Sequence, residues 1–155
     1  MAYKEIITEL YQWQYDEKIY REYYFMEKTP EKTAEFLKKH ADHNTEANWA
    51  VDPENFDEHE KEEEFIADCS NVSLVKHPRY IPLFYHEHDF FEMVYVLSGS
   101  CINYYEDTEE NLTAGDLSLI APEVVHGLRA VQDDSIIINI LIRRSTFMDI
   151  FYNTV

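Results

Sequence analysis

Three side chains that can bind a metal ion lie close together in the segment from His86 to Glu92, which reads HEHDFFE. His86, His88 and Glu92 occupy alternate positions, so in a β-strand, with its two-residue period, they leave the same face. Two imidazoles and a carboxylate suit a divalent first-row ion with open coordination positions. We therefore weigh one bound Zn, Ni, Mn or Fe ion against the alternative of no cofactor.

A fourth ligand would have to come from elsewhere in the fold, and His126 is the obvious supplier. It follows a segment in which Gly115 and Asp116 turn the chain into a strand and Pro122 ends that strand. His126 should then begin the next strand at the mouth of a barrel. Closure of the barrel would bring His126 close to His86, and the expected metal ligands are His86, His88, Glu92 and His126.

Short β-type runs separated by Pro, Gly, Asn and Asp follow Phe65, in the spacing of antiparallel sandwiches and barrels. The expected strands are Val72–Lys76, Phe91–Leu97, Cys101–Glu106, Asn111–Thr113, Leu117–Ile120, Gly127–Ala130 and Ser135–Ile142. Gly99 within Ser-Gly-Ser predicts a tight hairpin, and the cluster from Asp107 to Glu110 predicts another turn. Strand alternation places Phe90, Val94 and Val96 in the interior that His86 and Glu92 face.

Helical patterns fill the first part of the chain. Apolar residues mostly four apart predict one long amphipathic helix from Tyr3 to Glu27, apolar over an arc wide enough to contact both the barrel and another subunit. Thr29, followed by proline and glutamate, predicts the N-cap of a short helix that ends near His40. Between Asp42 and Glu64 acidic residues far outnumber the single lysine, which predicts a solvated segment or an exposed helix.

Composition limits the classes of function. The chain of 155 residues is the size of one domain, and its formal net charge of -18 disfavours contact with nucleic acid or an anionic membrane. Its two cysteines are in no metal-binding spacing and are expected to be free thiols. With no signal-peptide pattern, and with Ile136–Ile142 as the longest apolar run, the protein is expected in the cytoplasm.

The spacing HxH, three residues, Glu, six residues, Gly resembles the first cupin motif, which His86, His88, Glu92 and Gly99 match in full. The second motif is matched more loosely by three residues, Gly115, Pro122 and His126. The positions that depart from the two motifs are Tyr80, Glu123, Val124 and Ala130. The resemblance implies an all-β core, a cupin barrel of the double-stranded β-helix or jelly-roll type, with N-terminal helices and the start of a C-terminal helix.

Three stretches, HEHDFFEMVYVLSGSCINYY, LTAGDLSLIAPEVVHGL and IIINILIRRSTF, resemble the N-terminal sensor domain of AraC/XylS-type transcription regulators. The resemblance covers about Val72 to Phe147. It implies a barrel that binds a small polar effector, often a sugar, and a homodimer formed with the help of the attached helices. The expected effector-binding residues are His86, His88, Phe90, Glu92, Tyr104 and His126.

The expected organisation is an N-terminal helical and acidic extension (1–66), the cupin barrel (67–146) and the start of a C-terminal helix (147–155). DNA would be contacted through a basic helix-turn-helix domain that this chain lacks, so we expect a fragment of a longer regulator that is not itself an enzyme and has no membrane contact. One alternative is a small metal-dependent cupin enzyme, an oxygenase or isomerase. Another is an interaction protein that acts through its aromatic N-terminal helix and has a filled, inert pocket.

Overall fold

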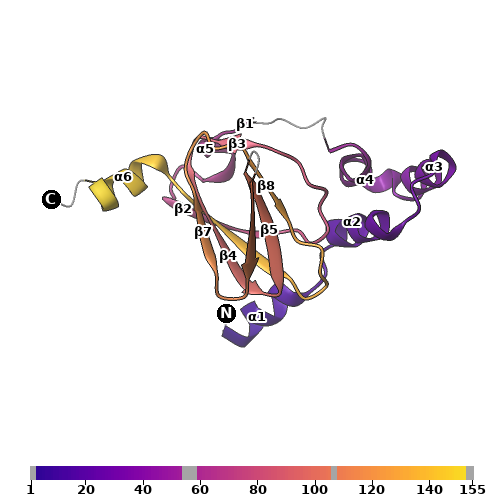
Figure 1. Ribbon diagram of the computed structural model, residues 1–155, viewed down its shortest axis with the longest axis horizontal. Coiled ribbons are helices and arrows are strands. Elements are labelled where there is room, and N and C mark those ends of the chain that lie inside the picture. The colour runs from indigo at the N-terminus through magenta and orange to yellow at the C-terminus, as the bar shows by residue number, and fades with distance from the viewer. Residues whose placement is uncertain (1–2, 54–58, 106–107, 153–155) are drawn as a thin grey trace.

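Two antiparallel sheets face each other at the centre of the molecule (Figure 1). The computed structural model describes residues 3–53, 59–105 and 108–152. One sheet has the strand order β2-β9-β4-β7, with β2 Val72–His77, β9 Ile136–Ile142, β4 Phe91–Ser98 and β7 Leu117–Ile120. The other has the order β6-β5-β8, with β6 Thr108–Thr113, β5 Ser100–Tyr105 and β8 His126–Arg129. The expected all-β core, a jelly-roll barrel of the cupin type, is confirmed.

The seven expected strands are all present, and their ends differ from the expectation by at most three residues. A further short strand, β1 His59–Glu60, pairs in parallel with β3 Glu87–His88. Val94 and Val96 of β4 are buried in the barrel core, as strand alternation predicted, and the residues between them are partly buried. Glu92 faces the same interior and is only 3% exposed.

The turn at Gly99 joins the two sheets and is not a hairpin, so that expectation is wrong. β4 pairs with β7 and β9, whereas β5 pairs with β6 and β8. Gly99 has φ +68°, and a Cβ there would lie 2.7 Å from the backbone of Ser135. The Ser135 hydroxyl donates to the carbonyl of Ser100 at 2.7 Å, which holds this corner closed. The turn expected at Asp107 lies partly outside the described residues, but β5 and β6 on either side of it do pair.

The long N-terminal helix is interrupted, which corrects the expectation of a single helix. Helix α1 covers Tyr3–Tyr11 and α2 covers Tyr15–Phe25. At the break the backbone N–H of Gln14 donates to the Glu17 carboxylate at 2.9 Å. A continuous helix would leave the Glu17 side chain without this contact, and the periodicity of the apolar residues gave no sign of the interruption.

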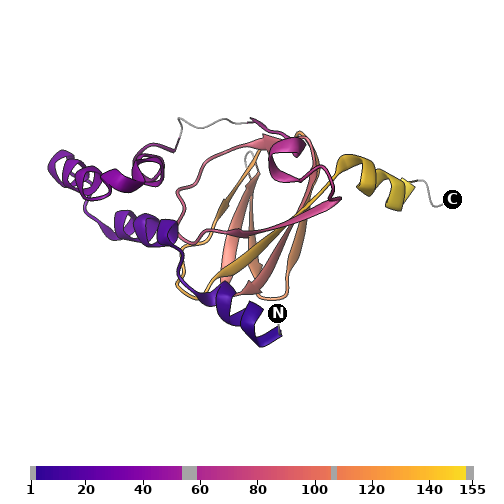
Figure 2. The same ribbon diagram turned by 180° about the vertical axis from the view of Figure 1, so that it is seen from behind.

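The remaining helices lie outside the barrel. Helix α3 Pro30–Lys39 begins as expected, with the Thr29 hydroxyl accepting from the Lys32 amide at 3.3 Å. The 3-10 helix η1 Ala41–His43 leads into α4 Asn44–Val51, and α5 Glu62–Phe65 precedes β2. Helix α6 Arg144–Tyr152 extends from the barrel on the side opposite α2, α3 and α4 (Figure 2).

The acidic segment is less solvated than expected. Ala47 and Ala50 of α4 are buried against α2, in a cluster that includes Ile19 and Tyr20. Residues 54–58 of this segment lie outside the described residues. The segment therefore contributes a packed helix to the fold, because alanines offer a small apolar face that charge counting does not detect.

The two cysteines are free thiols, as expected: Cys69 is exposed and Cys101 is buried in the barrel core. None of the helices within the described residues is long and apolar enough to cross a lipid bilayer.

A buried ion pair fastens α2 to the barrel. Glu17 is fully buried, and its carboxylate accepts from Arg79 Nε at 3.0 Å and from Arg79 Nη2 at 2.8 Å. Lys76 Nζ lies 2.9 Å from the same carboxylate. Arg79 also donates to the carbonyl of Asp133 at 2.7 Å, and its guanidinium lies 3.8 Å from the ring centre of Trp13. Burial raises the pKa of Glu17, but the hydrogen bonds from Arg79, Gln14 and Lys76 outweigh it and lower the pKa to about 2.

Replacing Glu17 by Gln should lower the free energy of unfolding by about 3–5 kcal/mol, because Arg79 and Lys76 would stay buried without a counter-charge. Urea denaturation at neutral pH measures this change. Glu9→Gln, at an exposed position of α1, is the matched control and should change stability by less than about 0.5 kcal/mol. Equal loss in both variants would contradict the assigned role of the ion pair.

The difference in stability between wild type and Glu17→Gln should depend on pH. Since folding lowers the pKa of Glu17 from 4.5 to about 2, its contribution is complete above about pH 4.5 and is lost as the pH falls towards 2. Denaturation curves between pH 7 and pH 2 should therefore converge at the acid end. A difference that stays constant over this range would show that Glu17 does not stabilise the fold through its charge.

Candidate ligand-binding site

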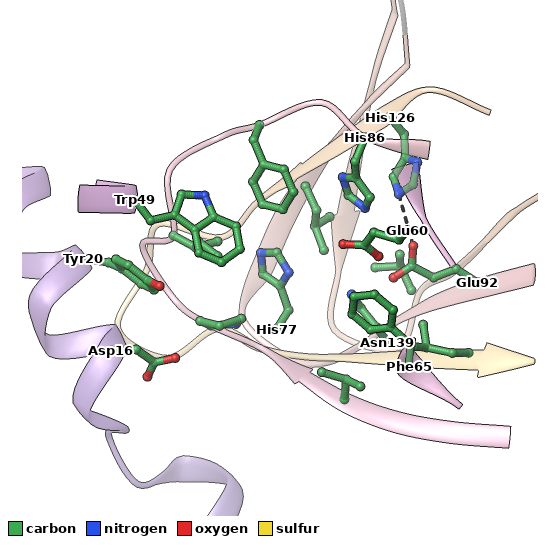
Figure 3. Close-up of a pocket in the computed structure, with 17 residues that line it drawn as sticks. Asp16, Tyr20, Trp49, Glu60, Phe65, His77, His86, Glu92, His126 and Asn139 are labelled. Atoms are coloured by element: carbon green, nitrogen blue, oxygen red, sulfur yellow. Dashed lines mark hydrogen bonds and ion pairs between the residues drawn. The ribbon is translucent and has the colours of Figure 1, made fainter. Parts of the chain in front are cut away.

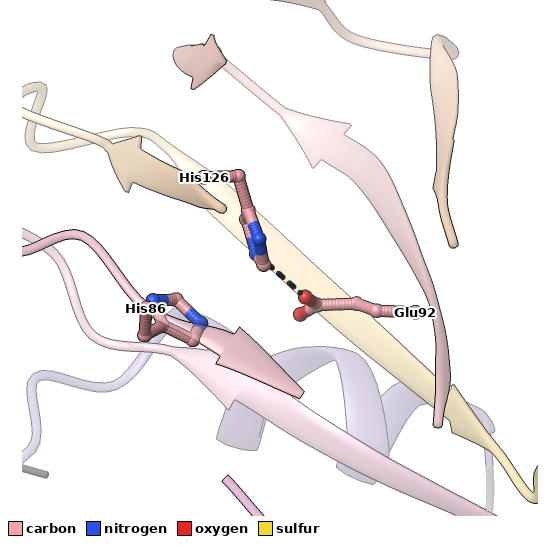
Figure 4. Close-up of side chains that lie close together, drawn as sticks. All are labelled: His86, Glu92 and His126. Atoms are coloured by element: carbon pink, nitrogen blue, oxygen red, sulfur yellow. Dashed lines mark hydrogen bonds and ion pairs between the residues drawn. The ribbon is translucent and has the colours of Figure 1, made fainter. Parts of the chain in front are cut away.

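The motif residues meet where β3, β4 and β8 begin. His86 and His126 form an isolated antiparallel bridge, in which each backbone N–H donates to the other carbonyl at 2.9 Å. This bridge places the two imidazole rings 4.3 Å apart. Glu92, on β4, points to the same place from the opposite sheet, as Figure 4 shows.

Glu92 is held by two imidazoles. Its Oε2 lies 3.2 Å from Nε2 of His88 and 3.1 Å from Nε2 of His126. The Nδ1 atom of each ring faces a backbone carbonyl, that of Phe90 at 2.8 Å and that of Val124 at 3.0 Å. Since Nδ1–H must donate to these carbonyls, a neutral ring presents the lone pair of Nε2 to the carboxylate. A proton or a metal ion is therefore needed between each Nε2 and Glu92.

Three of the four expected ligands converge on one point. One ligand atom from each of His86, Glu92 and His126 lies within 4.8 Å of the others, so these residues fit a divalent first-row ion. His88 is outside this group, and its contacts with Glu92 and Phe90 indicate that it orients the carboxylate. Burial raises the pKa of Glu92, but the hydrogen bonds of His126 and His88 outweigh it and hold the pKa well below its usual range. Burial lowers the pKa of His86 to about 3, so this ring is neutral at pH 7.

A cavity of about 230 Å³ opens beside these residues, between the barrel and the N-terminal helices (Figure 3). Its polar lining comes from Asp16, Glu60, His77, His86, Glu92, His126 and Asn139. Its aromatic lining comes from Tyr20, Trp49, Phe65 and Phe84. The barrel supplies one wall, while α2 and α4 supply the other through Tyr20 and Trp49. A molecule bound here would contact both parts of the chain.

The other expected effector-binding residues do not line this cavity. Phe90 packs with Ile66 and Leu141 and stacks on the ring of His88, with 4.4 Å between ring centres. Tyr104 is not among the residues that line this cavity, and strand alternation turns the neighbouring Tyr105 towards the barrel core together with buried Cys101. The Tyr105 hydroxyl forms a hydrogen bond with the hydroxyl of Ser118 at 2.9 Å.

Several lining residues were not found from the sequence. Glu60 lies in the segment that its charge marked as solvated, yet burial and the charge of Glu92 raise its pKa to about 7. His77 belongs to neither motif, yet it lines the cavity, and burial lowers its pKa to about 4. Its position next to Pro78 at the end of a strand was the only available signal. Trp49 and Asn139 reach the cavity only because helices and strands distant in sequence pack together.

Comparison with known families identifies the barrel. Residues 77–144 match the model of the family described as the AraC-like ligand binding domain. The cupin-type sensor recognised from the motifs is therefore confirmed over these residues, which include His86, Glu92 and His126. The helices that close the other side of the cavity lie outside the match. A search of curated proteins finds no match.

The solved structures to which the chain is similar include cupin proteins. A cupin-2 domain protein from Shewanella frigidimarina is 28% identical over 50% of this chain and 76% of its own, with a TM-score of 0.40. KdgF from Halomonas sp. is 26% identical over 47% of this chain and 68% of its own, with a TM-score of 0.41. A transcriptional regulator of the HTH_3 family from Vibrio cholerae is 18% identical over 50% of this chain and 46% of its own, with a TM-score of 0.42.

Zn²⁺ should stabilise the protein through His86, Glu92 and His126. At about 100 times its dissociation constant, a metal that binds only the folded state adds about 2.7 kcal/mol to the free energy of unfolding. A double variant with His86→Ala and His126→Ala should lose this stabilisation in thermal denaturation, whereas the His59→Ala control should keep it. Equal stabilisation of all three proteins would place the metal elsewhere.

Proposed function

We propose that this chain is the effector-sensing and dimerisation domain of an AraC-type transcription regulator, in which a small organic molecule occupies the cavity beside His86 and His126. One observation carries the proposal: the cavity is lined both by residues of the matched family region and by α2 and α4. A filled and inert pocket, as an interaction protein would have, does not agree with this cavity. DNA would be contacted by a helix-turn-helix domain outside these residues.

A ligand in this position can act on the helices directly. Tyr20 of α2 and Trp49 of α4 line the cavity from the helical side, and His77 and Asn139 line it from the sheet. Binding favours whichever helix position best contacts the ligand, and the equilibrium between positions shifts by the difference in affinity. The helices thus form the element that transmits occupancy of the cavity.

The acidic charge of the chain supports a division of labour with a separate DNA-binding domain. With a formal net charge of -18, this domain repels the phosphate backbone. A sensor that acts on the position of a basic domain does not need to approach DNA itself.

We further propose that a second copy of the chain covers the outer face of the sheet β2-β9-β4-β7. Leu74 of β2 is 69% exposed on this face, and Leu117 and Leu119 of β7 are about half exposed. The register aligns Leu74, Ile140, Met93 and Leu119 across the four strands. Apolar residues of α6, Ile150 among them, are also exposed. An exposed apolar face of this extent is typical of protein interfaces.

A metal-dependent cupin enzyme is the second candidate, and the convergence of His86, Glu92 and His126 favours it. An ion there could polarise a bound oxygen atom of a substrate. Turnover that is lost in a His88→Ala variant would support this candidate. Effector-dependent binding to an operator without turnover would rule it out.

Trp49→Ala and His86→Ala should each weaken the response to the effector by about tenfold or more, because each removes a cavity wall. The effector is first identified by thermal denaturation against a panel of small polar metabolites, and affinities are then measured by calorimetry. Phe25→Ala, an exposed position of α2 away from the cavity, is the control. If the panel contained binders that neither cavity variant affected, the ligand would bind elsewhere.

Leu74→Asp combined with Leu119→Asp should weaken dimerisation by about 100-fold or more, because two charges would enter an apolar interface without partners. Analytical ultracentrifugation over a concentration series measures this. Asn111→Asp, exposed on the opposite sheet, is the control and should leave the dimer unchanged. A dimer of undiminished stability in the double variant would move the interface away from this face.

A further inference from the structure

Apart from the proton or metal ion between His126 and Glu92, the charged groups that line the cavity are acidic. Asp16, Glu60 and Glu92 contribute carboxylates, and no lysine or arginine is found among the lining residues that the structure describes. His77 and His86 also line it, and burial keeps both rings uncharged at neutral pH. The cavity therefore disfavours an anionic ligand.

Two of the three carboxylates are already occupied. Asp16 accepts from the backbone N–H of Glu17 at 2.7 Å, and Glu92 is held by His88 and His126. The Glu60 carboxylate makes no hydrogen bond or ion pair with any residue in the described part of the chain. It points into the cavity between His86 and Glu92, as Figure 3 shows.

The backbone of Glu60 is firmly placed although its carboxylate is unpaired. Glu60 pairs with His88 in the parallel β1–β3 ladder, and its carbonyl accepts from the Asp89 amide at 3.3 Å. The ladder therefore presents a fixed carboxylate to the cavity, next to the motif residues.

Three further polar side chains in the cavity have an atom without a partner within the described residues, and the Nδ1 atom of His86 is one of them. The Nε2 atom of His77 is buried without a hydrogen bond, and the side chain is 92% buried. The Oδ1 atom of Asn139 is also buried and unpartnered. Together with the Glu60 carboxylate, these atoms form a set in which hydrogen-bond acceptors predominate. An ammonium group carries donors and no acceptor, so it complements this set.

Aromatic rings form the rest of the cavity wall. Trp49 and Phe84 lie with their ring centres 5.2 Å apart, and Tyr20 of α2 also lines the cavity. Ring faces attract cations and also pack against apolar groups. A ligand with a positive group and a compact apolar body would satisfy both parts of the cavity.

We infer that the cavity selects a small organic cation, whose ammonium group is bound by Glu60 with help from Asn139 and His77 and whose apolar body packs on Trp49 and Phe84. This inference rests on the proposed ligand-binding function and narrows its ligand from polar metabolites in general to amines. A sugar offers the Glu60 carboxyl group no counter-charge, and an acid would place a second acidic group beside it.

Benzylamine, benzyl alcohol and benzoate share one apolar body and differ in the end group, so they serve as probes. Isothermal titration calorimetry on the intact chain, as purified and after chelator treatment, should give benzylamine an affinity about tenfold or more above that of benzyl alcohol, with benzoate weakest. Glu60→Gln should remove most of this tenfold preference, because an amide gives the ammonium group no counter-charge. Glu63→Gln, at an exposed position nearby, is the matched control and should keep the preference.

The other possible results of these titrations each contradict a different part of the proposal. If benzyl alcohol, benzoate or a panel of sugars bound as tightly as benzylamine and other amines, the cation inference would fail and the sensor function would stand. A preference for benzylamine that persisted in Glu60→Gln would overturn the assignment of Glu60. If amines, alcohols, sugars and acids all failed to bind, the proposed function would fail together with the inference. A thermal denaturation midpoint of Glu60→Gln close to that of Glu63→Gln shows that the variant is folded.

Discussion

The buried ion pair between Glu17 and Arg79 holds the helical and β parts of this protein together, and the geometry of the cavity depends on it. Glu17 lies in the first turn of α2 and Arg79 follows β2. Their bidentate contact therefore holds the first turn of the helix against the barrel. Arg79 also donates to the carbonyl of Asp133, and Lys76 approaches the same carboxylate. With α2 fixed, Tyr20 and the packed α4 lie over the open side of the sheet and form the second wall of the cavity.

The same cavity contains two chemically different regions. At one end His86, Glu92 and His126 bring together nitrogen and oxygen atoms that could hold a metal ion. Along the walls the rings of the helices and of the segment before β3 present an apolar surface. Glu60 stands between the two regions. A metal at the first region and an organic molecule at the second are therefore compatible, because different side chains hold them.

Strand positions and the motif spacing could be predicted because both follow from local rules. Alternation in β4 places Glu92, Val94 and Val96 inside, since successive side chains point to opposite faces of a strand. Side chains also alternate along β5, and it is Tyr105, not Tyr104, that faces the barrel core. The sequence alone did not show which of these two neighbours faces inwards. Gly99 is a similar case, because a glycine in the sequence predicts a turn but not which strands the turn connects. Only the structure shows that this turn leads from one sheet to the other and that a side chain there would clash with Ser135.

The sequence by itself determined the barrel, the convergence of His86 with His126 and Glu92, and the acidic net charge of the chain. These features depend on periodicity, motif spacing and total charge, which are properties of the chain in any conformation. Only the tertiary structure decided that the helix breaks before α2, that Glu60 and His77 line the cavity, and that Trp49 forms its wall. The physical reason is that burial and neighbouring charges arise from contacts between distant segments, and those contacts turn a solvated acid or an unassigned histidine into part of a site.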